Sequence, residues 1–370
     1  MTAIEKALEK PHNLSKEEMA KLLGATQREE VEALSSAARE LKRRIFGNRV
    51  AIRGIVEIGN RCSKDCFYCG IRASNRNICR YSLNVDDIDR MAARNAELGY
   101  QSIVIQGGEI ESEANTRFIE EVLRRIEKYS LGVTLSLGEQ EFDVYKRWKD
   151  AGAHRYLLRI ESSSRELYSR IHPCGYSWER RVNCLKDLRK CGYQVGTGTM
   201  SSLPWQTLDD LAGDIAFFGE VDADMIGMGP YIPHPDTPLS VSDTERTNKE
   251  RLLLALNMIS VTRLYLHDVN IASTTALEAL APDGREQGIL AGANVVMPNV
   301  TDVEYREGYQ LYSGKPGLSE ASFASKSRLD ANLAAIGEVI DYSSRGDSPH
   351  NRRNVAFSFL AKHNVFGRFF

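Results

Sequence analysis

The chain has no excess of charge of either sign, because 48 lysines and arginines nearly balance 50 aspartates and glutamates and leave a formal net charge of −2 at pH 7. Proteins that bind nucleic acid through its phosphates need a basic surface. The chain also has no apolar run of about eighteen residues, the length that a membrane-spanning helix requires. We therefore expect neither nucleic acid nor a membrane among its partners.

Two further absences concern the cellular compartment. Met1–Lys6 carries no apolar signal segment, and the seven cysteines are an odd number. Both features favour a reducing cytoplasm, where disulfides are rare, so we expect a cytoplasmic location. No internal repeat, low-complexity tract or long linker interrupts the 370 residues, and 42% of them are hydrophobic, which is normal for a globular core.

Three of the cysteines lie close together. Cys62, Cys66 and Cys69 follow the spacing C-x3-C-x2-C within the run Asn60–Gly70. Three thiolates on one short loop can hold three corners of a cubane iron–sulfur cluster, and the iron without a protein ligand stays open to a small molecule. An open iron indicates chemistry rather than electron storage alone.

Zinc, disulfides and chance are the alternatives to a cluster. Structural zinc needs a fourth Cys or His with its own short spacing, and no C-x2-C or H-x3-H partner pair occurs elsewhere in the chain. The remaining cysteines are irregularly spaced, so we expect ordinary thiols, with a second cluster as the alternative. They are Cys79, Cys174, Cys184 and Cys191.

Short β-rich runs alternate with amphipathic helical stretches after residue 50. This alternation favours a parallel sheet with crossovers, and eight such units close into an α/β fold, the (β/α)8 TIM-type barrel. Active sites of such barrels lie at the carboxyl ends of the strands, and the cysteine motif directly follows the first predicted strand. The predicted strands are 51–58, 102–106, 133–137, 156–160, 194–200, 225–229, 269–273 and 294–297.

Segments of different character flank the barrel, which we assign to residues 51–317. Residues 1–50 form an N-terminal helical segment, in which Ser15 is a predicted N-cap. Residues 318–370 form a C-terminal extension with a helical segment over 329–340. The extension either packs on or near the barrel or docks a partner. Its aromatic, basic end contains Phe357, Phe359, Phe366, Phe369 and Phe370.

The cysteine motif resembles that of the radical S-adenosylmethionine (SAM) superfamily, in which C-x3-C-x-aromatic-C binds a [4Fe–4S] cluster and SAM binds the fourth iron. Tyr68 stands at the aromatic position. The resemblance implies that one electron from the cluster cleaves SAM to methionine and a 5′-deoxyadenosyl radical, which attacks the substrate. The radical chemistry belongs to the cofactor, and the protein supplies orientation and excludes water.

A glycine-containing motif ends the second predicted strand. It consists of Gln106, Gly107, Gly108 and Glu109. Glycines there permit a close backbone approach to a ligand that a Cβ would block. The resemblance implies that this GGE motif contacts the amino group of SAM.

Further candidate SAM contacts follow later strands. Glu161 closes the fourth predicted strand as a candidate for the SAM ammonium or ribose, and Arg181 follows it as a candidate for the SAM carboxylate, with a surface salt bridge as the alternative. The proline-rich loop 229–238 is too irregular for a strand or helix. Its Tyr231 and Ile232 are expected to form a wall around the adenine.

Candidate substrate contacts lie at the ends of other strands. A cation and a carboxylate at the barrel mouth should have partners, because an unpaired charge is costly away from water. Threonine hydroxyls from the third and seventh strands suit an anionic ligand, although buried threonines that satisfy a nearby carbonyl are the alternative. The candidate substrate residues are Thr134, Arg159, Ile160, Thr274, Thr275 and Tyr305.

The resemblance extends over residues 47–314 to the branch that holds the [FeFe]-hydrogenase maturases of the HydE type, the methylornithine synthases (PylB) and, more distantly, biotin synthase. The SAM residues and the substrate set named above, Tyr305 included, are what this likeness implies. One departure is Ile160, where HydE-type enzymes usually carry a polar residue, often His. The runs that carry the likeness are 68–72, 134–139, 155–159, 232–239 and 292–299.

Three hypotheses of function follow. The first is a HydE-like radical SAM enzyme that acts on a small anionic, amino-acid-derived substrate and serves maturation of the hydrogenase H-cluster. The second is a PylB-like amino-acid carbon-skeleton mutase, and the third is a non-catalytic iron–sulfur carrier or scaffold. Expected partners are a small-molecule substrate, an electron donor such as ferredoxin or flavodoxin, and other maturation proteins.

Overall fold

The computed structural model describes residues 2–242 and 246–351, and its centre is a sheet of ten parallel strands. The hydrogen-bonded order is β12-β1-β11-β10-β8-β6-β5-β4-β3-β2. The strands are β1 (Arg49–Ile52), β2 (Gly54–Gly59), β3 (Ser102–Gly107), β4 (Gly132–Ser136), β5 (Arg155–Leu157), β6 (Gln194–Thr197), β8 (Met225–Ile226), β10 (Asn270–Ser273), β11 (Val295–Val296) and β12 (Val339–Asp341).

The sheet closes on itself because β1 and β2 are two halves of one extended segment that is interrupted only at Arg53. β1 pairs with β11, and β2 pairs with β3. The seam is completed by bonds from the Arg53 amide to the Val296 carbonyl, 3.1 Å, and from the Ile55 amide to the Pro298 carbonyl, 2.8 Å. Each predicted strand overlaps an observed strand, and the predicted (β/α)8 barrel is confirmed.

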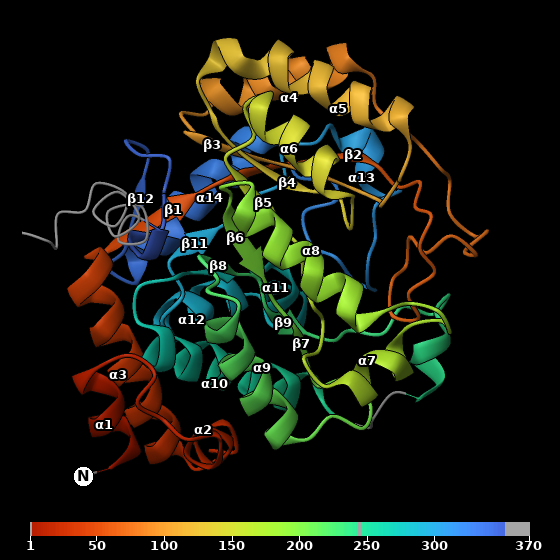
Figure 1. Cartoon of the computed structure of the whole chain (residues 1–370). Coiled ribbons are helices and arrows are strands. Elements are labelled where there is room, and N and C mark those ends of the chain that lie inside the picture. Colours follow the sequence, from red (N-terminus) through yellow and green to blue (C-terminus); the bar gives the residue numbers. More distant parts are fainter. Residues whose placement is uncertain (1, 243–245, 352–370) are drawn as a thin grey trace, which may run out of the picture.

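Helices surround the barrel (Figure 1). Many begin at a polar residue that caps the free backbone amides. Asn84, for example, accepts a bond from the Asp87 amide at the start of α4. The helices are α1 (Ala3–Glu9), α2 (Lys16–Leu23), α3 (Arg28–Phe46), α4 (Val85–Glu97), α5 (Glu113–Ile126), α6 (Phe142–Asp150), α7 (Arg165–Ile171), α8 (Trp178–Lys190), α9 (Leu208–Glu220), α10 (Asn248–Leu266), α11 (Thr275–Leu280), α12 (Gly284–Leu290), α13 (Val303–Arg306) and α14 (Ser322–Ala335).

Several short elements lie outside the ten-stranded sheet. A separate pair of parallel strands, β7 (Met200–Ser201) and β9 (Gly229–Pro230), continues the direction of β6 and β8 beyond the barrel. Two 3₁₀ helices are η1 (Glu127–Tyr129) and η2 (Pro238–Ser242). The N-terminal helices pack on the outer helices, α2 on α9 and α3 on α10.

The C-terminal extension closes the end of the barrel opposite the cysteine motif. The Arg53 and Asn270 side chains, at the amino ends of their strands, donate to the Gly346 carbonyl at 3.1 and 2.9 Å. Arg155 donates to the Arg345 carbonyl at 2.7 Å and pairs with Asp347. The predicted helix over 329–340 is correct for α14, but its end is wrong, because residues 339–341 extend the sheet as β12 beside β1.

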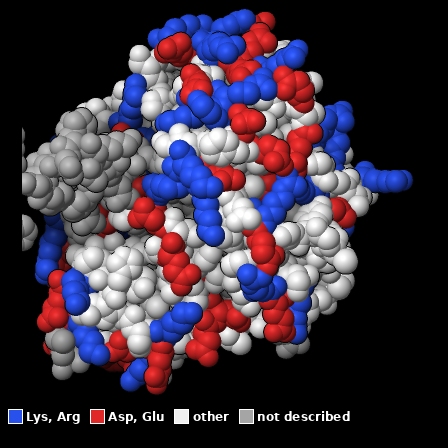
Figure 2. Space-filling view, in the orientation of Figure 1, with Lys and Arg blue, Asp and Glu red and all other residues white. Residues whose placement is uncertain are grey.

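The predicted aromatic end of the extension, residues 352–370, lies outside the described residues. On the face shown in Figure 2, basic and acidic side chains are interspersed. In the described part of the chain, no helix is both long and apolar enough to cross a membrane.

Candidate active site

A cavity of about 330 Å³ lies at the carboxyl ends of the barrel strands, beside the cysteine motif. It brings together most of the predicted site residues, from segments spread over more than 200 positions of sequence. The predicted residues that line it are Cys62, Cys66, Cys69, Tyr68, Gln106, Gly107, Gly108, Glu109, Arg159, Glu161, Arg181, Tyr231, Ile232, Thr274 and Thr275.

The cysteine loop is held against the end of β3. The Ser63 amide donates to the Glu109 carbonyl at 2.8 Å, and the Cys62 sulfur accepts bonds from the amides of Lys64, 3.4 Å, and Glu109, 3.3 Å. A Cβ on Gly108 would overlap the Arg61 carbonyl oxygen, so the loop can approach this strand end only over a glycine. The glycine therefore serves the packing of the cysteine loop.

The donor set fits an iron–sulfur cluster. Burial raises the pKa of all three thiols, that of Cys66 to about 12, so the thiolates need the positive charge of a metal to form. Amide bonds to a ligand sulfur, as at Cys62, are a regular feature of cluster sites. Within residues 2–242 and 246–351, no group of three His, Cys, Asp or Glu side chains is arranged to hold a single metal ion.

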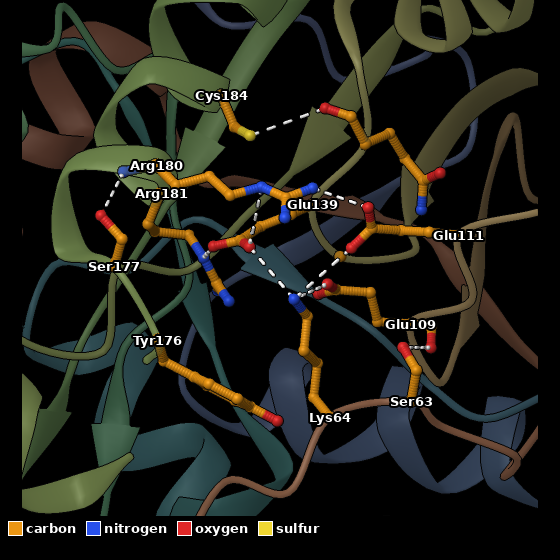
Figure 3. Close-up of polar contacts among 12 residues, drawn as sticks. Ser63, Lys64, Glu109, Glu111, Glu139, Tyr176, Ser177, Arg180, Arg181 and Cys184 are labelled. Atoms are coloured by element: carbon orange, nitrogen blue, oxygen red, sulfur yellow. Dashed lines mark hydrogen bonds and ion pairs between the residues drawn. The ribbon is translucent and has the colours of Figure 1, made fainter. Parts of the chain in front are cut away.

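Lys64, which belongs to the cysteine loop, lies at the centre of a group of carboxylates (Figure 3). Its ammonium nitrogen is 3.0 Å from Glu109, 3.4 Å from Glu111 and 3.4 Å from Glu139. Arg181 donates from Nε to Glu139 at 2.6 Å and from Nη1 to the Arg159 carbonyl at 2.8 Å. Arg181 is buried, so its pair with Glu139 is not a surface salt bridge.

Burial raises the pKa of these carboxylates, and nearby cations lower it. The balance of the two effects differs between Glu109 and Glu139. Burial raises the pKa of Glu109, and the charges of Arg181 and Lys64 offset it only in part. At Glu139 burial also raises the pKa, but the charge and hydrogen bond of Arg181 and the charges of Lys64 and Arg180 together outweigh it, and the net pKa is lowered. Glu139 is therefore the more firmly ionised of the two.

The end of the fourth strand presents a second ion pair to the cavity. Arg159 lies 2.9 Å from Glu161 and donates to the Thr199 carbonyl at 3.0 Å. Glu161 has a left-handed backbone with φ of 65°, which is strained for a residue with a side chain. Burial raises the pKa of Glu161, although Arg159 opposes the shift. The strained turn places a carboxylate in the cavity wall.

Three predicted substrate residues do not line this cavity, and their role toward the substrate stays a prediction. Ile160 is fully buried in the main hydrophobic core, because the side chains on either side of it, Arg159 and Glu161, take the cavity positions. Thr134 lines a smaller cavity among the strands, which shares Leu157, Gly227 and Met297 with the larger one. Tyr305 packs against Tyr81 on the outside, with ring centroids 5.2 Å apart.

The sequence interpretation missed the wall formed by residues 309–316. Lys315 pairs with the buried Glu57 and donates to the Tyr309 carbonyl at 2.8 Å. Asn299 donates to the other oxygen of Glu57 at 3.0 Å. Glu57, Asn299 and Lys315 all line the cavity. No sequence motif predicts this contact, because Lys315 and Glu57 lie 258 positions apart in the chain.

Comparisons with known proteins agree with this geometry. Residues 56–218 match the family model of the radical SAM superfamily. The chain is 44% identical to the [FeFe] hydrogenase maturase subunit HydE of Thermotoga maritima over 77% of its own length and 80% of that protein. It is 26% identical to a 3-methylornithine synthase of Methanosarcina acetivorans over 81% of its length and 83% of that protein.

Solved structures support the fold. The methylornithine synthase PylB superposes with a TM-score of 0.80 at 24% identity, covering 93% of this chain and 98% of that one. The maturase HydG superposes with a TM-score of 0.78 at 21% identity, covering 92% of this chain and 76% of that one. At these identities the likeness establishes the barrel alone.

The cysteine motif, the family match and the HydE relative together establish the cofactors as a [4Fe–4S] cluster and SAM, used with a reductant on a small molecule. The chain is a radical SAM enzyme and belongs to the radical SAM superfamily, in the family of the [FeFe]-hydrogenase maturase HydE.

Proposed function

We propose that this radical SAM enzyme acts on a small anionic, amino-acid-derived compound inside the barrel and serves maturation of the [FeFe]-hydrogenase H-cluster. The observation that carries the proposal is one continuous cavity that runs from the three cysteines to Arg159 and Lys315. Four cationic side chains line the cavity against three carboxylates, and this excess of positive charge favours a small anion. The 44% identity to HydE supports the hydrogenase role.

Residues around the cysteine loop would bind the cluster and the amino and carboxylate groups of SAM. Cys62, Cys66 and Cys69 hold the cluster, which with bound SAM supplies the 5′-deoxyadenosyl radical. Glu109 accepts the SAM ammonium. Arg181 has five N–H groups. Two of them are hydrogen-bonded to Glu139 and to the Arg159 carbonyl, so the others can bind the SAM carboxylate.

The remaining predicted residues form the adenosine and substrate walls. Glu161 accepts the ribose hydroxyls, and Tyr231 and Ile232 cover the adenine. Arg159, Thr274 and Thr275 face the substrate. Since the cavity lies under the cysteine loop, the substrate is shielded from water during radical transfer.

The test is reductive SAM cleavage by anaerobically reconstituted enzyme. Formation of 5′-deoxyadenosine is measured with dithionite, with ferredoxin or with flavodoxin, in the presence and absence of a cysteine-bound iron carbonyl cyanide compound. Cys62→Ala is the blank. We expect strong stimulation by that compound, and cleavage without stimulation would contradict the hydrogenase role.

A PylB-like carbon-skeleton mutase is the second candidate, favoured by the 26% identity to a 3-methylornithine synthase over 81% of this chain. It predicts that lysine, rather than an iron compound, stimulates the cleavage. A non-catalytic cluster carrier predicts no 5′-deoxyadenosine above the Cys62→Ala blank. The same assay therefore separates the three functions.

A further inference from the structure

Asp214 is a fully buried carboxyl group in the middle of α9, and the mechanism described above does not use it. Within residues 2–242 and 246–351, it forms no ion pair with Lys, Arg or His. A buried carboxylate is costly unless another group compensates it. The other buried residues of α9 are apolar, namely Leu211, Ala212, Ile215, Ala216, Phe217 and Phe218.

The compensation comes from a backbone amide. The Ser163 amide donates to Asp214 Oδ1 at 2.6 Å, a short bond for a nitrogen donor and an oxygen acceptor. Burial raises the pKa of Asp214 to about 7, and both the carboxylate and the neutral acid keep an oxygen that can accept this bond. Asp214 therefore ties α9 to the loop that follows the fourth predicted strand.

Ser163 belongs to the turn that carries Glu161 into the cavity wall. On the other side of this turn, the Glu161 amide donates to the Gly198 carbonyl at 3.0 Å, and the Met200 amide donates to the Glu161 carbonyl at 3.2 Å. Directly after Ser163, Ser164 caps α7. The left-handed backbone of Glu161 is strained and persists only where the surrounding structure fixes it. The bond to Asp214 fixes the turn between Glu161 and α7.

We propose that Asp214 is a positioning residue for SAM, because its bond to the Ser163 amide fixes the turn that holds the Glu161 carboxylate toward the SAM ribose. The inference rests on the proposed function, which assigns Glu161 to the ribose hydroxyls. Asp214 is not among the residues that line the cavity, so it acts through the backbone of the turn. A turn that is not fixed in advance must be ordered when SAM binds, and this ordering lowers the affinity.

Asp214→Leu and Asp214→Asn test the role, because leucine removes the acceptor at similar size and asparagine keeps a carbonyl oxygen. The Kd for SAM is measured by equilibrium binding to anaerobically reconstituted enzyme without substrate, with iron and sulfide content in parallel. We expect Asp214→Leu to raise the Kd roughly 10-fold at normal cluster content, and Asp214→Asn to remain close to the wild type. The proposal is overturned if Asp214→Leu has the wild-type Kd or if both variants are weakened equally.

A double variant shows whether Asp214 acts through Glu161. Glu161→Ala removes the carboxylate and should itself raise the Kd for SAM. Adding Asp214→Leu to Glu161→Ala should raise it little further, because the contact that the turn positions is already lost. A second rise of roughly 10-fold in the double variant would mean that Asp214 acts elsewhere, and the proposal would fail.

Asp224→Leu is the matched control. Asp224 is another fully buried aspartate that accepts a backbone amide, that of Val195 at 2.8 Å, but it directly precedes β8, at the end of the barrel away from the cavity. Its loss should lower stability and leave the Kd for SAM unchanged. A rise in Kd equal to that of Asp214→Leu would indicate a general loss of stability and would count against a positioning role.

If Asp214→Leu does not fold, Asp214→Ala is measured in its place, because alanine removes the acceptor without adding apolar bulk. Failure of the proposed function has a different signature. A wild-type Kd in Glu161→Ala would remove Glu161 from the SAM site, and with it the assignment on which the role of Asp214 depends. Weak binding in Glu161→Ala beside a wild-type Kd in Asp214→Leu would overturn the role of Asp214 alone.

Discussion

The two neighbouring arginines at the start of α8 differ in burial although they are adjacent in sequence. Arg181 is buried and bonded to Glu139 and to the Arg159 carbonyl, whereas the Arg180 side chain is 40% exposed and pairs with Glu111. Helical geometry turns consecutive residues by about 100°, so one faces the cavity and the other faces solvent.

This difference yields a prediction for SAM affinity. Arg181→Lys keeps the charge but loses the planar fork, so a charge-assisted hydrogen bond worth about 1.5–3 kcal/mol is lost. We expect the Kd for SAM to rise roughly 10- to 100-fold. Equilibrium binding to the reconstituted enzyme measures it, with Arg180→Lys as the matched control. Equal effects of the two substitutions would remove Arg181 from the SAM site.

At the scale of elements, the junction of the cysteine loop with β3 depends on close backbone packing. A Cβ on Gly108 would overlap backbone atoms of Arg61, which cannot rotate away, whereas a Cβ on Gly107 would lie 3.0 Å from a movable Ile58 side-chain atom. Gly108→Ala should therefore lose most of its cluster, and Gly107→Ala should retain it. Iron and sulfide analysis after reconstitution checks this, and full cluster content in Gly108→Ala would contradict it.

The wall formed by residues 309–316 is attached by the buried pair of Lys315 and Glu57, with side chains 8% and 3% exposed. Removing one member of a buried pair leaves the other charge uncompensated. Lys315→Met should thus lower the free energy of unfolding by about 3–5 kcal/mol, and adding Glu57→Gln should recover part of the loss.

Anaerobic denaturant unfolding of the cluster-loaded enzyme measures both effects. Lys146→Met is the control, because the side chains of its pair with Asp150 are 58% and 65% exposed and the pair should contribute at most about 1 kcal/mol. A loss in Lys315→Met no larger than in this control would show that the pair does not attach the wall.

At the scale of the whole molecule, the C-terminal extension joins the end of the described chain to the base of the barrel. His350 lies 2.7 Å from Asp222 and 3.3 Å from Asp268, and hydrogen bonds to these carboxylates raise its pKa to about 9. His12 and Asp224 also act electrostatically on this imidazole. At neutral pH a positive His350 holds the extension in place.

The sign of the pH dependence follows. Because the folded pKa lies above the unfolded value of about 6.5, the stabilisation by His350 is complete below pH 6.5 and is lost as the pH rises through about 9. The difference in unfolding free energy between the wild type and His350→Gln should be larger at pH 6 than at pH 9.5. Denaturant unfolding at the two values measures it, and a difference that does not change with pH would argue against a charged His350.

Local patterns in the sequence determined the cluster motif, the alternation of eight strands and helices, and the placement of the motif after the first strand. These features depend on neighbours within a few residues, because thiol spacing, capping and periodicity are local properties. The TIM-type barrel could therefore be predicted before any contact was known, and the cofactors followed from the superfamily that the cysteine motif resembles.

The tertiary structure alone decided which side chains face the cavity. Ile160 lies in the core beside two cavity residues, Lys315 reaches Glu57 from a distant segment, and His172 meets Tyr68 across 104 positions. Such contacts depend on how strand ends twist and on how separate loops pack together, and no spacing within one segment encodes them. The sequence by itself determined the kind of chemistry, and the fold decided which residues surround it.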